Sequence, residues 1–430
     1  MNYSTQLPLF RAIRFTALVL LVSLLPAALR AADEPAPRWW KGNLHTHSLW
    51  SDGNDYPEQI IRWYEESGYQ FLALSDHNVF QEGQRWIDAT NNAGGALAVE
   101  KYVEEFGTNW VEFRTTNGKR EVRLKPLSEF RSLFERPGEF LLIPGLEVTD
   151  QYLSFPVHMN LTNGRDIIEP QGGDSVFHVM QNNMDAAIAQ RERTGQAMLL
   201  HLNHPNFGWG ITTEELMRVS GERFFEVYNG HPAVRNEGDP FHPGTERMWD
   251  IILTWRLAIL GMEPMFGLAV DDSHEYHTFA EGKSNSGRGW IMVRSRFLTP
   301  EYLISAMEAG DFYASSGVIL EDIGAAQDSL SVTVRAEPGV TYTIQFIGTR
   351  KGFDRVSTPL TTSDGVELRL SHRYSSDVGE ILKEVSGPQA NYSFKGNEIY
   401  VRAKVTSSKL KFNPYVTDEV ESAWTQPVIP

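Results

Sequence analysis

The segment PEQIIRWYEES at Pro57–Ser67, followed by QFLALS at Gln70–Ser75, decides the fold class. The first segment has the apolar spacing of an amphipathic helix, and the second is a short apolar run typical of a buried strand. A helix followed at once by such a strand is the repeating unit of α/β proteins. The pair therefore predicts an α/β architecture.

The same alternation of apolar runs and helical patterns extends from about residue 39 to residue 316. Most of the predicted strands contain or adjoin a His, Asp, Glu or Asn near the carboxyl end. Loops at the carboxyl ends of parallel strands converge on one mouth, so we expect these polar groups to meet there, as in a barrel-like enzyme. The further predicted strands are Phe140–Val148, Val157–Asn163, Ala197–Asn203, Phe224–Tyr228, Met265–Val270 and Gly289–Val293.

The C-terminal residues change to short alternating strands, such as Ser329–Ala336, Thr341–Gly348 and Tyr400–Val405. This pattern predicts a small all-β, sandwich-like domain over residues 327–430, after an α/β domain over residues 39–320. The C-terminal domain carries little titratable chemistry. We therefore expect it to pack, bind a surface or shield the active site rather than catalyse.

Residues 82–138 are rich in Asn, Gly and charges and predict an insertion into the α/β domain. A helix is expected near Ala96–Phe106 and a hairpin turn at Asn117-Gly118. The insertion is either a lid or substrate-selecting wall, or a plain surface elaboration.

The N-terminal residues predict a secretory signal peptide over residues 1–31. Arg11 and Arg14 precede the apolar run Ala17–Leu29 without any acid, and cleavage is expected after Ala31 or Ala32. An uncleaved anchor is the competing interpretation, but the run is shorter than the roughly 20 residues of a spanning helix. The mature protein is thus expected to be periplasmic or extracellular, with no stable membrane span.

Composition limits both the ligands and the partners. The chain has no cysteine, so neither disulfides nor thiolates are available, and any metal must be bound by His, Asp or Glu. Loss of three arginines with the signal peptide changes the formal charge from -16 to -19, which disfavours a broad nucleic-acid surface. A small anionic or ester substrate would need local positive charge, which bound metal could supply.

The most informative chemical motif is HTHSLWSDG at His45–Gly53. His45 and His47 occupy alternate positions of an extended segment, so both imidazoles face the same side and can reach one metal. Asp52 follows in a Ser-Asp-Gly turn, from which its carboxylate could reach the same centre. A chance His-x-His is common, but the combination is much more specific.

Other metal-ligand residue types stand at or near the ends of predicted strands. Asp76 and His77 follow one strand in LALSDHN, and Glu147 ends another in LIPGLEVT. The remaining motifs are VHMN with His158, HLNHP with His201 and His204, and VDDSH with Asp271, Asp272 and His274.

In this order the motifs resemble the PHP family, the polymerase and histidinol phosphatase metallohydrolases, over roughly Trp39–Ser316. The resemblance implies a distorted (β/α)7 barrel that binds up to three divalent metal ions, for which Zn, Mn or Fe would suit the donors. It also implies the metal ligands, which are His45, His47, Asp52, His77, Glu147, His158, His204, Asp272 and His274.

Two ligand choices have close competitors. His201 precedes His204 by three residues, and the His-Pro step favours His204. Asp271 adjoins Asp272, and the Asp-x-His spacing favours Asp272. Asp76 is a candidate to orient a neighbouring ligand.

The other histidines have simpler interpretations. His178 falls in a helical stretch and is expected to be structural. His231, His242 and His277 are expected to be surface or satisfied polar residues, with substrate contact as the less favoured role.

A second resemblance covers Ser286–Gly317, which contains GRGW at Gly287–Trp290 and GDFYASSG at Gly310–Gly317 around a predicted helix. It is similar to the exported branch of the family that includes carbaryl hydrolase, which implies that carbamate or carboxylic ester cleavage is possible on the same site. Arg288 is a candidate catalytic residue that clamps substrate oxygens, and a structural salt bridge is its alternative role.

Three functions follow from these motifs. The leading hypothesis is a metal-dependent phosphoesterase, in which bound metal activates water and offsets the charge of a phosphate mono- or diester. The second is a carbamate or carboxylic ester hydrolase, which a flat apolar pocket near Trp110 and Phe113 would favour. The third is a non-catalytic metal-containing binding protein, which would bind metal without turnover.

Overall fold

The computed structural model describes residues 1–2, 34–361 and 367–430. Contacts between residues divide the chain into Met1–Pro35 and Ala36–Pro430, and the second unit contains all the described helices and strands. The predicted signal peptide lies outside the described residues, apart from the first two. Within the described part of the chain, no helix is both long and apolar enough to cross a membrane.

The decisive helix and strand form as predicted. Helix α1 (Pro57–Glu66) starts with a proline, whose fixed φ suits the first helical turn, and buries Ile60 and Tyr64 on one face. Strand β2 (Phe71–Leu74) is entirely buried and pairs in parallel with β1 (Arg38–Asn43). A buried strand with an amphipathic helix before it is thus confirmed here.

Thirteen of the described strands form one large mixed sheet in the order β12-β9-β8-β7-β6-β2-β1-β13-β14-β23-β22-β17-β20. All the predicted strands of the α/β part are present. The sheet is mixed because β7 and β13 run antiparallel to their neighbours, which corrects the expectation of successive parallel strands. Further strands of this part are β6 (Leu141–Tyr152), β7 (Phe155–Thr162), β8 (Leu199–Leu202), β9 (Phe224–Asn229), β12 (Phe266–Val270), β13 (Trp290–Ser295) and β14 (Phe312–Ser315).

Two features of this sheet collect polar groups at one edge. Strand β7 is antiparallel to β6, so its amino end lies beside the carboxyl end of β6, and His158 pairs in register with Thr149. An isolated parallel bridge joins Thr46, after β1, to Ser273, after β12. The segments that follow β1 and β12 therefore meet, although five strands lie between these two in the sheet order.

Helices pack against the sheet and bury its apolar residues. Ser175 caps α4 by accepting a hydrogen bond from the His178 backbone N–H, and Gly195 ends the helix with a φ of 66°. The largest core cluster combines side chains of α4 and α6 with those of β6 to β9. The helices of this part are α4 (Val176–Thr194), α5 (Thr213–Leu216), α6 (Thr245–Trp255) and α7 (Pro300–Glu308), with short turns η1 (Phe207–Trp209) and η2 (Arg256–Leu260) and the small β10 (Gly238–Asp239) and β11 (His242–Pro243) pair.

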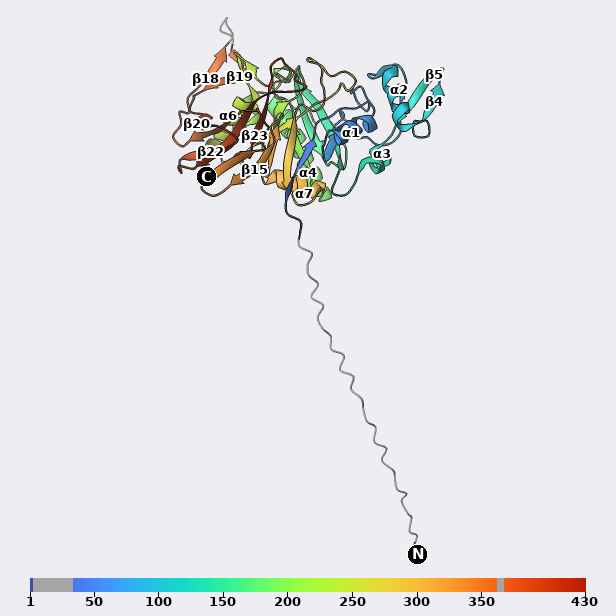
Figure 1. The fold of residues 1–430 in the computed structure, drawn as a ribbon, viewed down its shortest axis with the longest axis horizontal. Helices are drawn as coiled ribbons and strands as arrows, with labels where there is room; N and C mark the ends of the chain where they lie inside the picture. The colour runs from blue at the N-terminus through green and yellow to red at the C-terminus, as the bar shows by residue number, and fades with distance from the viewer. Residues whose placement is uncertain (3–33, 362–366) are drawn as a thin grey trace. The chain divides into compact units, whose positions relative to one another are not determined.

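The predicted insertion forms its own small sheet of β3, β5 and β4, with the hairpin turn at Asn117-Gly118 as expected. Its core includes Leu49 and Trp50, which belong to the loop that carries Asp52. The insertion therefore packs against the HTHSLWSDG loop and supports it. In Figure 1 the insertion lies on the side of α1, away from β20 and β22. Its elements are β3 (Arg85–Asp88), α2 (Gly95–Phe106), β4 (Phe113–Thr116), β5 (Lys119–Leu124) and α3 (Leu127–Phe134).

After β14 the described chain is strand-rich, as predicted. Strand β23 pairs with β14, so the C-terminal strands extend the sheet of the α/β part instead of forming a separate compact unit. A second sheet of β15, β16 and β21 faces this extension, and one apolar cluster between them gives the sandwich-like arrangement. The strands are β15 (Leu320–Ala325), β16 (Ser329–Val334), β17 (Tyr342–Arg350), β18 (Ser357–Thr361), β19 (Glu367–Tyr374), β20 (Glu380–Ser386), β21 (Gln389–Ser393), β22 (Glu398–Leu410) and β23 (Val420–Thr425).

A buried acid before β9 predicts how stability depends on pH. Burial raises the pKa of Glu222 to about 8, while a hydrogen bond from the Phe224 N–H and the positive charge of the nearby Arg256 oppose the shift. The folded protein therefore holds this proton more tightly than the unfolded chain. The resulting stability is fully present below the unfolded value of 4.5 and is lost as the pH rises through about 8.

We expect the free energy of unfolding of the wild type, relative to Glu222→Gln, to fall by about 1 kcal/mol or more between about pH 5 and pH 9. Urea unfolding of both proteins across that range measures the difference, and other titrating groups cancel in the subtraction. Parallel pH profiles would contradict the assignment.

Candidate metal centre

The structure brings the nine predicted ligands together at one edge of the sheet. They come from separate segments that follow or belong to neighbouring strands, and most are buried. His45, His47 and Asp52 follow β1, His77 follows β2, Glu147 lies in β6, His158 in β7, His204 follows β8, and Asp272 and His274 follow β12.

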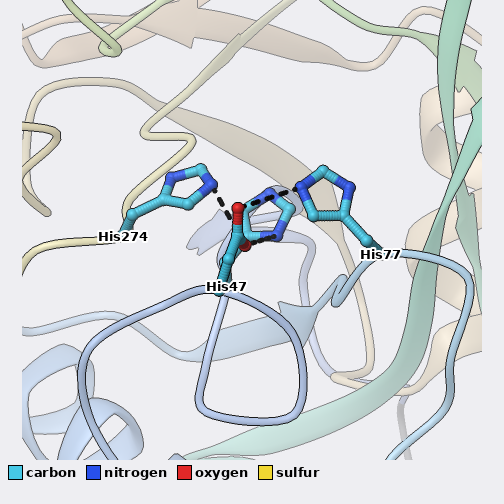
Figure 2. Close-up of side chains that lie close together, drawn as sticks. His47, His77 and His274 are labelled. Carbon is cyan, nitrogen blue, oxygen red and sulfur yellow. Dashed lines mark ion pairs between the residues drawn. The ribbon is translucent and has the colours of Figure 1, made fainter. Parts of the chain in front are cut away.

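One group of four side chains lies at the outer rim of this cluster. Asp52 places Oδ1 3.5 Å from His274 Nε2 and 3.7 Å from His47 Nδ1, and Oδ2 3.5 Å from His77 Nε2. Figure 2 shows the three imidazoles arranged around the carboxylate. The ligand atoms of these four residues lie close enough together to bind one ion. The Asp52 side chain is 56% exposed, so this group is open to solvent.

A second, buried set surrounds His45. Its Nε2 lies 3.1 Å from His47 Nε2 and 3.2 Å from Asp272 Oδ1, and His47 Nε2 lies 3.4 Å from Glu147 Oε2. Asp272 has a φ of 51°, which is uncommon for a residue other than glycine and is typical of functional sites. The alternate spacing of the two histidines does direct both rings to one place.

A third group forms on the other side of Glu147. His158 Nδ1 lies 2.9 Å and His204 Nε2 3.6 Å from Glu147 Oε1. Glu147 Oε2 faces His47 and His77. Because its two oxygens point to different groups, Glu147 is placed to bridge two ions.

The donor set fits divalent cations. Glu147 Oε2 is buried and receives no hydrogen bond from the described residues, although His77 Nδ1 lies 2.7 Å away. Leaving a buried carboxylate oxygen without a partner is costly, and a cation would satisfy it. Burial lowers the pKa of His47 to about 3, so its imidazole is neutral, whereas Glu147 and Asp52 raise the pKa of His77 to about 11 against the effect of burial, so metal binding would displace its proton.

The carboxylates are also in the charged form that metal binding needs. Burial alone would raise the pKa of Glu147, but His158 and His77 hold it well below its usual range. Likewise, His45 and a hydrogen bond from His47 hold the pKa of Asp272 well below its usual range against the effect of burial. Imidazole and carboxylate donors of this kind suit Zn, Mn or Fe.

Glu226, which lies in none of the sequence motifs, supports the cluster from behind. Its Oε1 accepts a hydrogen bond from His45 Nδ1 at 2.6 Å, and its Oε2 accepts one from the His204 backbone N–H at 2.7 Å. Burial opposes ionisation, but the neighbouring His45 lowers the pKa of Glu226 to about 2. This contact fixes the tautomer of His45 and leaves Nε2 free for a metal. The only sequence signal was a lone acid inside the apolar strand Phe224–Tyr228.

Replacing Glu226 by glutamine is expected to weaken metal binding by about 10- to 100-fold, because the outer partner of a ligand histidine sets its orientation and basicity. Competition with a chelator of known affinity measures the change. Glu222→Gln alters another buried acid just before the same strand and should leave metal affinity unchanged. Equal affinities in the wild type and Glu226→Gln would exclude the supporting role.

Geometry favours the preferred member of each ambiguous pair. His204 Nε2 faces Glu147 and Asp272 and belongs to two groups that could hold an ion, whereas His201 Nε2 lies 3.3 Å from Glu226 and belongs to one such group, with His45 and Glu226. Asp271 is turned away from the cluster: it accepts the backbone N–H groups of residues 287–289 and the Tyr64 hydroxyl. These bonds anchor the GRGW segment.

Asp76 positions a loop instead of touching a ligand ring. Its carboxylate accepts hydrogen bonds from the Ser48 N–H and hydroxyl, the Ser51 hydroxyl and Gln81 Nε2. The turn between His47 and Asp52 is thereby held in place.

Arg288 does not face the cluster. Its guanidinium donates to the backbone carbonyls of Gly230, Lys283, Ala280 and Asn413, among others, and the side chain is buried. Every N–H group is used, so no donor is left for substrate oxygens. The expectation that Arg288 clamps substrate oxygens is therefore wrong, and its role is structural. The structural contacts are hydrogen bonds to carbonyls and not the salt bridge considered as the alternative.

The remaining histidines differ in how near they lie to the cluster. His178 is half exposed on α4, His242 stacks on a tryptophan, and the ring of His277 faces a backbone carbonyl. The ring of His231 lies 5.5 Å from that of His274, at the edge of the cluster. Of these four, His231 is the one whose ring lies beside that of a candidate ligand.

Searches against protein-family models and against curated proteins found no match. Among solved structures, the chain is similar to a two-domain protein from Bacteroides vulgatus containing a predicted PHP-like metal-dependent phosphoesterase. The TM-score is 0.39 at 14% identity, over 91% of this chain and 95% of that one. A second similar structure is a proposed metal-dependent phosphoesterase from Bifidobacterium adolescentis, with a TM-score of 0.28 at 15% identity, over 58% of this chain and 91% of that one.

Proposed function

We propose that this protein is a PHP-type metal-dependent hydrolase that cleaves phosphate mono- or diesters. The observation that carries the proposal is the joining of three groups of imidazoles and carboxylates through Glu147 and the adjacent His45 and His47. The four carboxylates of the cluster, Asp52, Glu147, Asp272 and Glu226, offset only four of the six charges of three divalent ions. The remaining positive charge favours an anionic substrate.

The chain's own residues would divide the work. Divalent ions in these groups would supply Lewis-acid activation of water and positive charge beside a phosphoryl oxygen. Glu226 would hold the ring of His45 in orientation, and Glu147 would join the ligand groups on its two sides. The rim group around Asp52 is the exposed side, so the substrate would approach there and meet His231.

Further proposals concern the fold and the compartment. We take the seven strands from β12 to β1 to form the distorted barrel of the PHP family, which the bridge between Thr46 and Ser273 supports. We also retain export with removal of residues 1–31, on the basis of the N-terminal sequence pattern.

Carbamate or carboxylic ester hydrolysis is the alternative on the same ligands. A flat apolar pocket near Trp110 and Phe113 would favour this alternative. In the structure Trp110 Nε1 donates to buried Glu58, and Arg120 lies 3.8 Å above the Phe113 ring. Trp110 is thus bonded to α1 and Phe113 is covered within the insertion, which leaves the phosphoester as the favoured substrate.

The test combines metal analysis of the purified mature protein with hydrolysis of aryl phosphate mono- and diesters and an aryl methylcarbamate. His45→Ala should lose turnover, whereas His178→Ala, a histidine exposed on α4, should keep it. Phosphoester turnover with this pattern supports the proposal. Carbamate turnover alone would select the alternative, and bound metal without any turnover would select a binding protein.

A further inference from the structure

A cavity of about 670 Å³ lies where the α/β part meets the C-terminal strands. Its lining residues come from β1, α1, β13 and the segments around β22 and β23, and none of the nine candidate ligands lines it. The GRGW and ASSG segments contribute Gly287, Trp290, Ser316 and Gly317. Two motifs that the metal centre does not use therefore meet at this cavity.

Aromatic rings form its walls. Trp63 and Phe279 stack with centroids 5.8 Å apart, and Tyr69 meets Trp290 edge to face at 6.3 Å. Phe279 is 39% exposed and Phe412 is fully exposed at the lining. Exposed apolar rings beside a cavity are typical of a ligand site, and flat walls favour a planar ligand.

Two buried polar groups in these walls lack a hydrogen-bond partner among the described residues. The Tyr69 hydroxyl and Trp290 Nε1 form no hydrogen bond with any described residue, and their side chains are 3% and 8% exposed. Buried polar atoms are rarely left unpaired, because each costs roughly 1–3 kcal/mol. Both atoms can donate, so a ligand with acceptor oxygens would satisfy them.

The cavity also contains a cation, Lys41, that forms no ion pair with any described side chain. Its Nζ lies 3.8 Å above the Tyr69 ring and 4.1 Å above the Trp290 ring. Lys41 Nζ donates a long hydrogen bond, 3.5 Å, to the Ser67 carbonyl. Burial lowers the pKa of Lys41 to about 8, partly opposed by Asp271, so the ammonium is still mostly protonated at neutral pH.

The other charges at the cavity are already paired. Lys411 Nζ lies 2.9 Å from Glu419, and Glu421 lies 3.2 Å from Lys409. Lys41 is thus the charge that a ligand would neutralise. Gly287, with a φ of 85°, contributes to the shape, because a Cβ there would lie 2.9 Å from the Trp63 ring.

We propose that this cavity binds a planar aromatic carboxylate, with its ring between the Trp63 and Trp290 walls and its oxygens against Lys41, the Tyr69 hydroxyl and Trp290 Nε1. The site is separate from the metal centre and does not depend on the proposed hydrolase activity. The aromatic walls match the ring of such a ligand, and Lys41 matches its negative charge. The Tyr69 hydroxyl and Trp290 Nε1 match its acceptor oxygens.

Isothermal titration of the full mature protein with 2-naphthoate tests the proposal. Tyr69→Phe removes one hydroxyl and should weaken binding about three- to tenfold, and Lys41→Met should weaken it by about tenfold or more. Tyr302→Phe deletes an exposed hydroxyl elsewhere and should bind like the wild type. Because Tyr69→Phe keeps the ring and its packing, it separates ligand contact from folding.

Two comparisons locate the ligand and define its class. Cyclohexanecarboxylate keeps the charge and 2-naphthamide keeps the ring, and both should bind more weakly than 2-naphthoate. Binding should persist after treatment with a chelator and in His45→Ala, because no metal ligand lines the cavity. Loss of binding in either case would place the carboxylate on the metal centre and overturn the proposal, as would equal affinities in the wild type, Tyr69→Phe and Lys41→Met.

Discussion

Glu147→Gln is expected to lower kcat/KM for the hydrolysed ester by at least about 10³-fold, because it removes the one carboxylate shared by two ligand groups. Glutamine keeps the size of the side chain but offers one neutral acceptor where glutamate offers two charged oxygens. Those oxygens face His158 and His204 on one side and His47 and His77 on the other. We also expect the bound metal per chain to fall.

Metal content and turnover of the purified variant measure these losses together. Glu222→Gln, which replaces a buried acid outside the cluster, is the matched control and should retain both. Circular dichroism establishes that the variant is folded. A folded Glu147→Gln protein with full metal content and wild-type turnover would refute the bridging role.

The second large effect concerns the attachment of the C-terminal strands. Asp250→Ala is expected to lower the free energy of unfolding by about 3–5 kcal/mol, because it leaves a buried arginine without its partner. Arg402, on β22, donates from Nε and Nη2 to the Asp250 carboxylate of α6 at 2.8 and 2.7 Å. The hydroxyl of Tyr400 donates to the same carboxylate at 2.8 Å.

A neighbouring ion pair supplies the control for this experiment. Glu246 and Lys404 join the same helix to the same strand at 2.6 Å, but their side chains are 31% and 25% exposed. Glu246→Ala should therefore cost only about 0–1 kcal/mol. Chemical denaturation compares the variants, and Asp250→Ala/Arg402→Met should recover part of the loss. Equal small effects of Asp250→Ala and Glu246→Ala would show that the C-terminal strands do not depend on the buried pair.

The sequence predicted the local elements well, because their signals are local. The spacing in PEQIIRWYEES and the run FLAL suffice to specify α1 and β2, and Asn117-Gly118 suffices for a hairpin turn. The direction of β7 has no such signal. Because β7 is antiparallel to β6, His158 near its amino end lies at the same edge of the sheet as Glu147. Parallel strands would not have placed these two residues together.

The candidate ligands were predictable because each is a metal-binding residue type in a short motif at the end of a strand. Supporting residues carry no such mark. Glu226 reads as one acid in an apolar run, and only its contact with His45 shows what it does. Arg288 looked like a substrate clamp because charge is visible in sequence, whereas the carbonyls that occupy its guanidinium are not.

The sequence by itself therefore determined the elements, the ligand types and their order, since these depend on spacing within a few residues. The tertiary structure alone decided how Glu226 supports His45, how β23 joins β14, and where Lys41, Tyr69 and Trp290 enclose a cavity. These outcomes depend on contacts between residues that are distant in the chain. Such contacts are fixed by packing and by the pairing of buried charges, and no local pattern encodes them.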